Sequence, residues 1–201
     1  MCGIAGFYGR VDEKSNSVIT RMLTRIKHRG PDDGDVWFDE NVRLGLAHRR
    51  LSIIELTQAG HQPMQSSCKR YIIVFNGEIY NYKELGSLCA NKLDIDNISD
   101  SIIALEFIIE FGLTKFLELA QGMWAFALYN KAESTLQLVR DISGQKPLFY
   151  YPALDYTFFA STLTSCIKFN DIKLSDKIIY NFVQSGSLSI DELGIVSINP
   201  G

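Results

Sequence analysis

The second residue of the chain is a cysteine, and it opens the sequence Cys2-Gly3-Ile4-Ala5-Gly6. Removal of the initiator methionine leaves this cysteine with a thiol and a free α-amine, which are a nucleophile and a base on one residue. Thiols and α-amines both ionise near neutral pH, so neither needs a large environmental shift to act. The pattern predicts a catalytic nucleophile. The alternative is a cysteine buried by accident in a first strand.

A nucleophile that attacks a carbonyl also needs donors for the oxyanion that forms. Residues 70–76 form the clearest predicted central strand, with an apolar run from Tyr71 to Phe75, and we expect this strand to end at Asn76-Gly77. The asparagine offers a side-chain amide, and the glycine lets a backbone N–H approach the substrate closely. Asn-Gly is also the strongest short signal for a type I′ hairpin, and both interpretations stay open on the residues alone.

Three charged residues complete a possible site. Arg50 lies in the aperiodic segment 49–65, where it is either a bidentate clamp for a carboxylate or a solvated surface charge. Asp100 begins a helical pattern and either caps the helix or pairs with an ammonium group. Glu78 either does the same or holds a loop. Together with the cysteine and the Asn-Gly pair, they suit a molecule with a carboxylate, an ammonium group and an attackable carbonyl, and glutamine fits.

Composition narrows the class of protein. The chain has 201 residues, of which 46% are hydrophobic and 21% charged, as expected for one globular domain. A net charge of −3 disfavours a nucleic-acid or polybasic membrane partner, and no signal peptide or 18-residue apolar run occurs. Four scattered cysteines and three scattered histidines predict no metal site. We therefore expect a cytoplasmic protein with reduced thiols.

The elements that must position these residues follow from periodicity. We expect a turn at 29–34 and an extended tail at 193–201. We also expect a helix that is capped by Ser175 and ends near Gln184. The order of the expected strands and helices predicts an α+β domain with two packed sheets and helices outside. The predicted strands are 2–8, 35–39, 42–48, 70–76, 123–129, 135–140, 147–151 and 156–160, and the other predicted helices are 17–27, 82–91, 101–111 and 113–120.

An ordered set of motifs identifies a resemblance that covers nearly the whole chain. The set resembles the class II glutamine amidotransferase domain of glutamine-hydrolysing asparagine synthetases, which is an N-terminal-nucleophile hydrolase. Each motif alone is weak, but their order is specific. The motifs are Met1 to Gly6, His28-Arg29-Gly30-Pro31-Asp32, His48-Arg49-Arg50-Leu51-Ser52-Ile53-Ile54, Gln62-Pro63-Met64, Phe75-Asn76-Gly77-Glu78-Ile79-Tyr80-Asn81, Gly122 to Leu128, and Arg140-Asp141 with Gly144 and Lys146-Pro147-Leu148.

The resemblance implies a four-layer α/β/β/α sandwich, with a glutaminase domain at 1–190 and the start of a connection to a synthetase domain at 191–201. It implies that Cys2 attacks the glutamine side-chain amide while Asn76 and Gly77 form the oxyanion hole. Ammonia then leaves, and water hydrolyses the thioester to glutamate. By the same resemblance, Arg50 clamps the carboxylate. The backbone of Leu51, Ser52, Ile53 and Ile54 lines a closing loop, and Glu78 and Asp100 receive the ammonium group.

The resemblance also sets expectations about cofactors and partners. The glutaminase domain needs none, and ATP and magnesium are expected only in a synthetase domain outside this chain, because no Ser-Gly-Gly-x-Asp-Ser loop occurs here. The expected partners are glutamine and that ammonia-accepting domain, and a second copy in a homodimer stays open. Aspartate is the default acceptor, although other carboxylates such as sugar acids stay open.

Two positions depart from the family pattern, and two other functions compete. Ile102 and Thr162 stand where acidic residues are usual, which bears on the helix start near Asp100 and on contacts to a neighbouring domain. The alternatives are a catalytically silent interaction module and an N-terminal-nucleophile acylase. Retention of the cysteine and its supporting residues argues against the first. The pairing of Arg50 with Asp100 favours a free amino acid over the acyl substrate of the second.

Overall fold

The computed structural model describes residues 2–11, 15–51, 60–90, 98–166, 175–186 and 193–199. Its elements in chain order are β1 (Gly3–Gly9), α1 (Ser15–Arg25), the 3₁₀ helix η1 (Lys27–Arg29), β2 (Asp33–Asp39), β3 (Leu44–Arg50), β4 (Met64–Gln65), β5 (Tyr71–Ile79), α2 (Tyr82–Leu88), α3 (Asp100–Phe111), α4 (Leu113–Leu119), β6 (Gly122–Asn130), β7 (Thr135–Arg140), β8 (Phe149–Pro152), β9 (Tyr156–Ala160), α5 (Leu163–Cys166), α6 (Asp176–Ser185) and β10 (Val196–Ser197).

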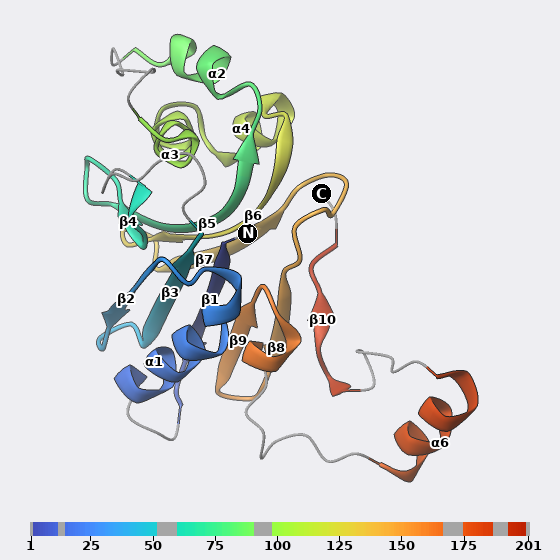
Figure 1. Cartoon of the computed structure of the whole chain (residues 1–201). Coiled ribbons are helices and arrows are strands. Elements are labelled where there is room, and N and C mark those ends of the chain that lie inside the picture. Colours follow the sequence, from blue (N-terminus) through green and yellow to red (C-terminus); the bar gives the residue numbers. More distant parts are fainter. Residues whose placement is uncertain are drawn as a thin grey trace.

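These strands form two antiparallel sheets that pack face to face (Figure 1). A six-stranded sheet has the order β10-β8-β9-β1-β3-β2, and a four-stranded sheet has the order β4-β5-β6-β7. Helices α1 and α5 cover the outer face of the first sheet, while α2, α3 and α4 cover the outer face of the second. The result is the predicted α/β/β/α sandwich.

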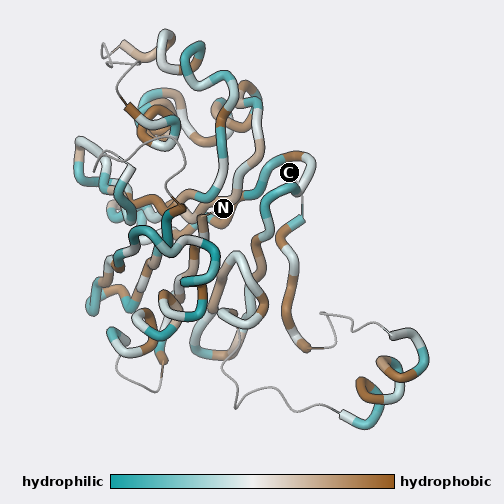
Figure 2. The backbone as a smooth tube through the Cα atoms, in the orientation of Figure 1, coloured by the Kyte–Doolittle hydropathy of each residue, from teal (hydrophilic) through white to brown (hydrophobic). Residues whose placement is uncertain are grey.

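Alternation along each strand creates three separate apolar layers. In β5, Ile72 and Val74 face the other sheet, whereas Ile73 and Phe75 pack under α3. In β1, Ile4 faces the four-stranded sheet, whereas neighbouring side chains pack under α1. Figure 2 shows hydrophobic residues distributed along the strands and α3. Both sheets are therefore covered on two sides, which explains the near-continuous apolar runs of their central strands.

Most predicted elements are confirmed within a few residues, and three differ in an informative way. Strand β5 does not end at Asn76 but continues to Ile79, because β6 pairs with it throughout. Helix α2 ends at Leu88 rather than near residue 91. The third difference is at the start of α3, where the cap is Ser99 and not Asp100: the Ser99 hydroxyl accepts from the Ile102 N–H.

The C-terminal elements follow the predicted order. Ser175 caps α6 as expected, its hydroxyl accepting from the Ile178 N–H. Figure 1 shows α6 apart from the two sheets. Strand β10 pairs with β8, so Val196 and Ser197 are part of the six-stranded sheet, while the domain boundary at 190 stays a prediction. No helix in the described part of the chain is both long and apolar enough to cross a membrane.

Candidate active site

Cys2 lies immediately before β1 and is partly exposed. Its carbonyl oxygen accepts a hydrogen bond of 3.0 Å from Nε of Arg29, at the end of η1. Because Ile4 faces the four-stranded sheet and side chains alternate, Cys2 is directed to the same side of β1. The β1–β3 register pairs Gly3 with Arg49, so continuing it by one residue brings Cys2 opposite Arg50.

Asn76 belongs to the inter-sheet face of β5, together with Ile72 and Val74. Its side chain is 1% exposed, and its Nδ2 has no hydrogen-bond partner among the described residues. Leaving a buried amide donor unpaired costs about 1–3 kcal/mol, and buried donors in folded proteins are rarely left so. The Asn76 amide thus has an unused donor on the inter-sheet face of β5.

Gly77 pairs with Trp124 of β6 inside a continuous strand, which excludes the hairpin interpretation of Asn-Gly. A Cβ at this position would lie 2.2 Å from the Met123 carbonyl oxygen and 2.6 Å from the Trp124 Cα. The glycine is therefore required by the close approach of β6, whatever its backbone N–H donates to.

The two adjacent arginines are directed to opposite faces of β3. Arg49 turns toward α1, where its Nε donates to the Leu23 carbonyl at 3.4 Å. Arg50 is half-buried and lies against Gly60, because a Cβ on that glycine would be 2.8 Å from its Nη2. Only Arg50 is therefore on the side of β3 toward which Cys2 and Asn76 are directed.

Asp100 connects the start of α3 to the end of β5. Its Oδ2 accepts from the Ile79 N–H at 2.9 Å, and its Oδ1 accepts from the Ser101 N–H at 2.8 Å. The pKa of Asp100 is raised, first by burial and further by the nearby carboxylate of Glu78, while the backbone donors oppose the shift. An ammonium group beside these two carboxylates would relieve both the desolvation and the repulsion.

The predicted glutamine-binding loop is only partly described. Leu51 is half-buried directly after β3, whereas Ser52, Ile53 and Ile54 lie outside the described residues. Of the two departures from the family pattern, Ile102 does not prevent α3 from starting at Asp100. Thr162 donates from its hydroxyl to Ser165 at the start of α5.

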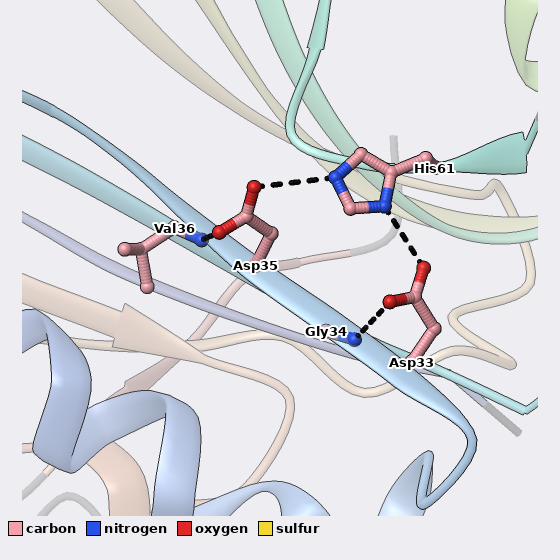
Figure 3. A network of polar contacts seen from close by, with 5 residues as sticks. All are labelled: Asp33, Gly34, Asp35, Val36 and His61. Carbon is pink, nitrogen blue, oxygen red and sulfur yellow. Dashed lines mark hydrogen bonds and ion pairs between the residues drawn. The ribbon is translucent and has the colours of Figure 1, made fainter. Parts of the chain in front are cut away.

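Beyond this loop, His61 binds two carboxylates of β2 (Figure 3). Its Nδ1 is 2.9 Å from Oδ2 of Asp33, and its Nε2 is 3.2 Å from Oδ2 of Asp35. The hydrogen bond to Asp33 is the largest cause that raises the pKa of His61, and the same bond lowers the pKa of Asp33. These contacts attach the segment around His61 to the six-stranded sheet.

We expect an NMR titration of the His61 ring to give a midpoint above its ordinary pKa of 6.5. The stabilisation from His61 is complete below pH 6.5 and is lost as the pH rises through the raised pKa. The stabilisation from Asp33 is present above its ordinary pKa of 3.8 and is lost as the pH falls through its lowered pKa in the folded protein. Because the His61 side chain is 43% exposed, the contribution is under about 1 kcal/mol.

The matched pair of variants for this titration is Asp33→Asn and Asp35→Asn. Asp33→Asn is expected to lower the His61 midpoint more, since its bond is shorter and is the main cause of the shift. An unchanged midpoint in Asp33→Asn would contradict the assignment.

Three residues near the site belong to the motifs, but the sequence predicts no role for them. Arg29 falls in a predicted turn, His48 lacks any recognisable ligand spacing, and Gln62 is known only from its motif. In the structure, the side chain of Arg29 binds the backbone of Cys2, and that of Gln62 binds the backbone of Phe75. His48 is buried between the sheets. No local pattern reveals such contacts, because each joins elements far apart in sequence.

Comparison with known proteins identifies the family of the chain. The family described as "Glutamine amidotransferase domain" matches residues 1–196. The chain is 34% identical to Asparagine synthetase [glutamine-hydrolyzing] 1 of Bacillus subtilis (91% of this chain, 29% of the relative). It is 36% identical to Asparagine synthetase B [glutamine-hydrolyzing] of Escherichia coli (74% and 26%).

The fold recurs in a more distant solved structure. Glutamine phosphoribosylpyrophosphate amidotransferase from B. subtilis superimposes with a TM-score of 0.67 at 18% identity, over 100% of this chain and 46% of that one. Across the curated relatives that it matches, the chain spans between 22% and 37% of their lengths. The sandwich, the arrangement of the site and the family match lead to one conclusion: this chain belongs to the family of glutamine amidotransferase domains, as found in glutamine-hydrolysing asparagine synthetases.

Proposed function

We propose that this domain hydrolyses glutamine to glutamate and ammonia through a thioester on Cys2. The Cys2 sulfur attacks the side-chain amide carbon, and a tetrahedral intermediate forms with its negative charge on the former carbonyl oxygen. Collapse of this intermediate breaks the carbon–nitrogen bond, and the nitrogen leaves as ammonia after it gains a proton. Water then attacks the thioester, which releases glutamate and restores the thiol.

The observation that carries the proposal is the unpaired amide of Asn76. Its Nδ2 is buried, has no partner among the described residues and shares the inter-sheet space with the side of β1 to which Cys2 is directed. A preoriented donor of this kind stabilises charge that develops during the reaction without any cost of reorganisation. The Gly77 N–H is the second donor in this proposal.

The proton transfers are assigned to the α-amine of Cys2, which is free once Met1 has been removed. A direct contact between this amine and its own thiol is strained, so a water molecule relays the proton from sulfur to nitrogen. The same amine then protonates the departing nitrogen. A single group thus acts first as a base and then as an acid, which requires that it titrates near the working pH.

Recognition of the amino-acid end of glutamine is assigned to three charged side chains. Arg50 holds the carboxylate, and Glu78 and Asp100 hold the ammonium group. The raised pKa of Asp100 supports this role. A carboxylate that is destabilised by burial and by a neighbouring negative charge is stabilised most by a nearby cation. The backbone from Leu51 to Ile54 closes over the bound substrate.

The ammonia is consumed, in this proposal, by a synthetase domain of the parent protein that binds ATP and magnesium, with aspartate as the default acceptor. The length of the relatives supports such a fusion, since each is several times longer than this domain. A cytoplasmic location and a homodimer belong to the same proposal.

Replacement of Arg50 and Arg49, one at a time, tests the substrate clamp. We expect Arg50→Ala to raise KM for glutamine by about 10- to 100-fold, which corresponds to a charge-assisted hydrogen bond of about 1.5–3 kcal/mol. Arg49→Ala should leave KM nearly unchanged, because this side chain bonds α1 on the opposite face. Glutamate release at varied glutamine concentration gives both constants. Equal effects would contradict the choice of Arg50.

The activity itself is tested by glutamate release from glutamine, with the N-terminus verified by mass spectrometry. A diazoketone analogue of glutamine, which alkylates thiols, provides a second test that does not require turnover. Excess glutamine should protect Cys2 from this reagent. A correctly processed and folded domain that neither releases glutamate nor shows this protection would favour the silent interaction module.

A further inference from the structure

One edge of β5 is covered by side chains instead of by a strand. Strand β4 pairs only with Ile72 and Ile73, and no other strand in the described part of the chain lies beyond it on that side. N–H groups of successive residues in a strand are directed to alternating edges. The Tyr71 N–H donates toward β4, to the Ser66 hydroxyl, so the N–H groups of residues 73, 75, 77 and 79 are directed to this same edge.

Two of these N–H groups are occupied by side chains from outside the sheet. Oε1 of Gln62 accepts from the Phe75 N–H at 2.6 Å, and Oδ2 of Asp100 accepts from the Ile79 N–H at 2.9 Å. The N–H of Gly77 lies between them at the same edge. The N–H groups of Phe75 and Ile79, on either side of the Gly77 N–H, therefore both have acceptors. These two hydrogen bonds keep the backbone between them in one conformation.

The carbonyl of Phe75 is held from the other sheet by His48. This histidine is 1% exposed on the inter-sheet face of β3 and forms a hydrogen bond with the Phe75 backbone. Since the Phe75 N–H is bonded to Gln62, the group that accepts from the ring is the carbonyl oxygen. The ring Nε2 has no partner among the described residues, so Nδ1 is the donor. Burial lowers the pKa of His48 to about 3, and the ring is neutral at working pH.

We propose that His48 and Gln62 are positioning residues that fix the two peptide groups flanking Phe75, through its carbonyl oxygen and its N–H, and thereby hold the Asn76 and Gly77 donors in register with Cys2. The inference rests on the proposed glutaminase function. Its physical basis is that His48 belongs to the sheet that carries Cys2, whereas Phe75 precedes the two donors in the other sheet. The hydrogen bond from His48 to Phe75 thus connects the sheet that carries Cys2 to the sheet that carries Asn76 and Gly77.

Such a bond matters for rate more than for substrate affinity. The oxyanion exists only after attack, so displaced donors weaken the transition state and leave the bound glutamine unaffected. Displacement of about 1 Å in a catalytic group costs about 100-fold in rate. The ends of the substrate are held by other residues, so KM should not follow kcat.

The first test compares His48→Leu with His48→Asn. Leucine removes the donor, whereas the asparagine amide nitrogen can occupy the position of ring Nδ1. We expect His48→Leu to lower kcat by about 10- to 100-fold, with KM for glutamine within about twofold of wild type. His48→Asn should recover most of this loss. Values of kcat are expressed per Cys2 that reacts with the diazoketone analogue, so that unfolded protein is not counted. A wild-type kcat in His48→Leu, or no recovery in His48→Asn, would overturn the proposal.

Gln62→Met provides a second variant if His48→Leu does not fold. It keeps the length of the side chain but removes the acceptor for the Phe75 N–H, and we expect the same loss of kcat without a change in KM. Because both side chains hold the backbone of one residue, Phe75, the double variant should lose less than the product of the two single effects. Strictly independent effects would contradict a shared role.

A readout that does not depend on activity separates this inference from the proposed function. In amide hydrogen exchange, His48→Leu should speed exchange at Phe75 and Gly77 while Leu128, at the far end of the β5–β6 pair, keeps its protection. Unchanged exchange would overturn the positioning role even in an active enzyme. Faster exchange in a domain without glutaminase activity would support the positioning and contradict only the function.

Discussion

Cys2→Ala is expected to lower glutamate release from glutamine by more than about 10³-fold, because it removes the sulfur atom that carries the acyl intermediate in the proposed mechanism. The side chain is partly exposed and belongs to none of the three buried apolar clusters, so the free energy of unfolding should change little. Initial rates of glutamate formation, together with thermal unfolding of both proteins, measure the two quantities.

The matched control is Cys68→Ala. Cys68 is exposed, and a hydrogen bond between its thiol and the Ser66 hydroxyl is the main cause that lowers its pKa, which makes it a thiol prone to react nonspecifically. Its replacement should leave the rate unchanged. A form of the wild type that retains Met1 should be as inactive as Cys2→Ala, since its amine no longer belongs to the cysteine. Activity in the unprocessed form would refute the role of the α-amine.

Asn76→Ala is expected to lower kcat by about 10²- to 10³-fold and to leave KM for glutamine nearly unchanged. The amide nitrogen has no partner among the described residues, so the substitution removes an unsatisfied buried donor and should change the free energy of unfolding by less than about 1 kcal/mol. Activity and stability should therefore separate. A large loss of kcat without a loss of stability is expected for a group that stabilises the transition state and not the fold.

Asn130→Ala gives the opposite result if this interpretation is correct. Asn130 is also a buried asparagine in the four-stranded sheet, but its Oδ1 accepts from Nε of Arg70 and from the Ala132 N–H. Its loss should cost about 1–2 kcal/mol of stability and leave kcat unchanged. A kcat for Asn76→Ala equal to that of wild type would exclude Asn76 from the oxyanion hole.

Much of the fold could be predicted from local pattern. The strand at Tyr156–Ala160 and the Ser175 cap of α6 appear as predicted, because alternation and capping chemistry are local properties. The predicted end of β5 was wrong for a nonlocal reason. Asn76-Gly77 is a turn signal by composition, but nine consecutive pairs with β6 keep the strand extended to Ile79. Of the two roles left open for Asp100, the structure excludes the cap, because Ser99 caps α3; by type, both residues are good caps.

The candidate site, like the fold, could be predicted only in part from the sequence. Residue type and order, together with the family resemblance, are enough to select Cys2, Arg50, Asn76, Gly77, Glu78 and Asp100. The sequence could not separate Arg50 from Arg49 by geometry. The structure does, because neighbouring residues of a strand are directed to opposite faces and only one face of β3 meets the other sheet.

Residue types along the chain therefore determine the class of chemistry, because a nucleophile, an amide donor and opposite charges are properties of single side chains. How these groups are held depends on the packing of the two sheets. The bonds from Arg29 to Cys2, from Gln62 to Phe75 and from His48 to Phe75 each join segments that are more than ten residues apart. Their partners are backbone atoms, which every residue possesses, so no side-chain pattern marks them. They form only when distant segments pack closely enough to bury a polar group that must then find a partner.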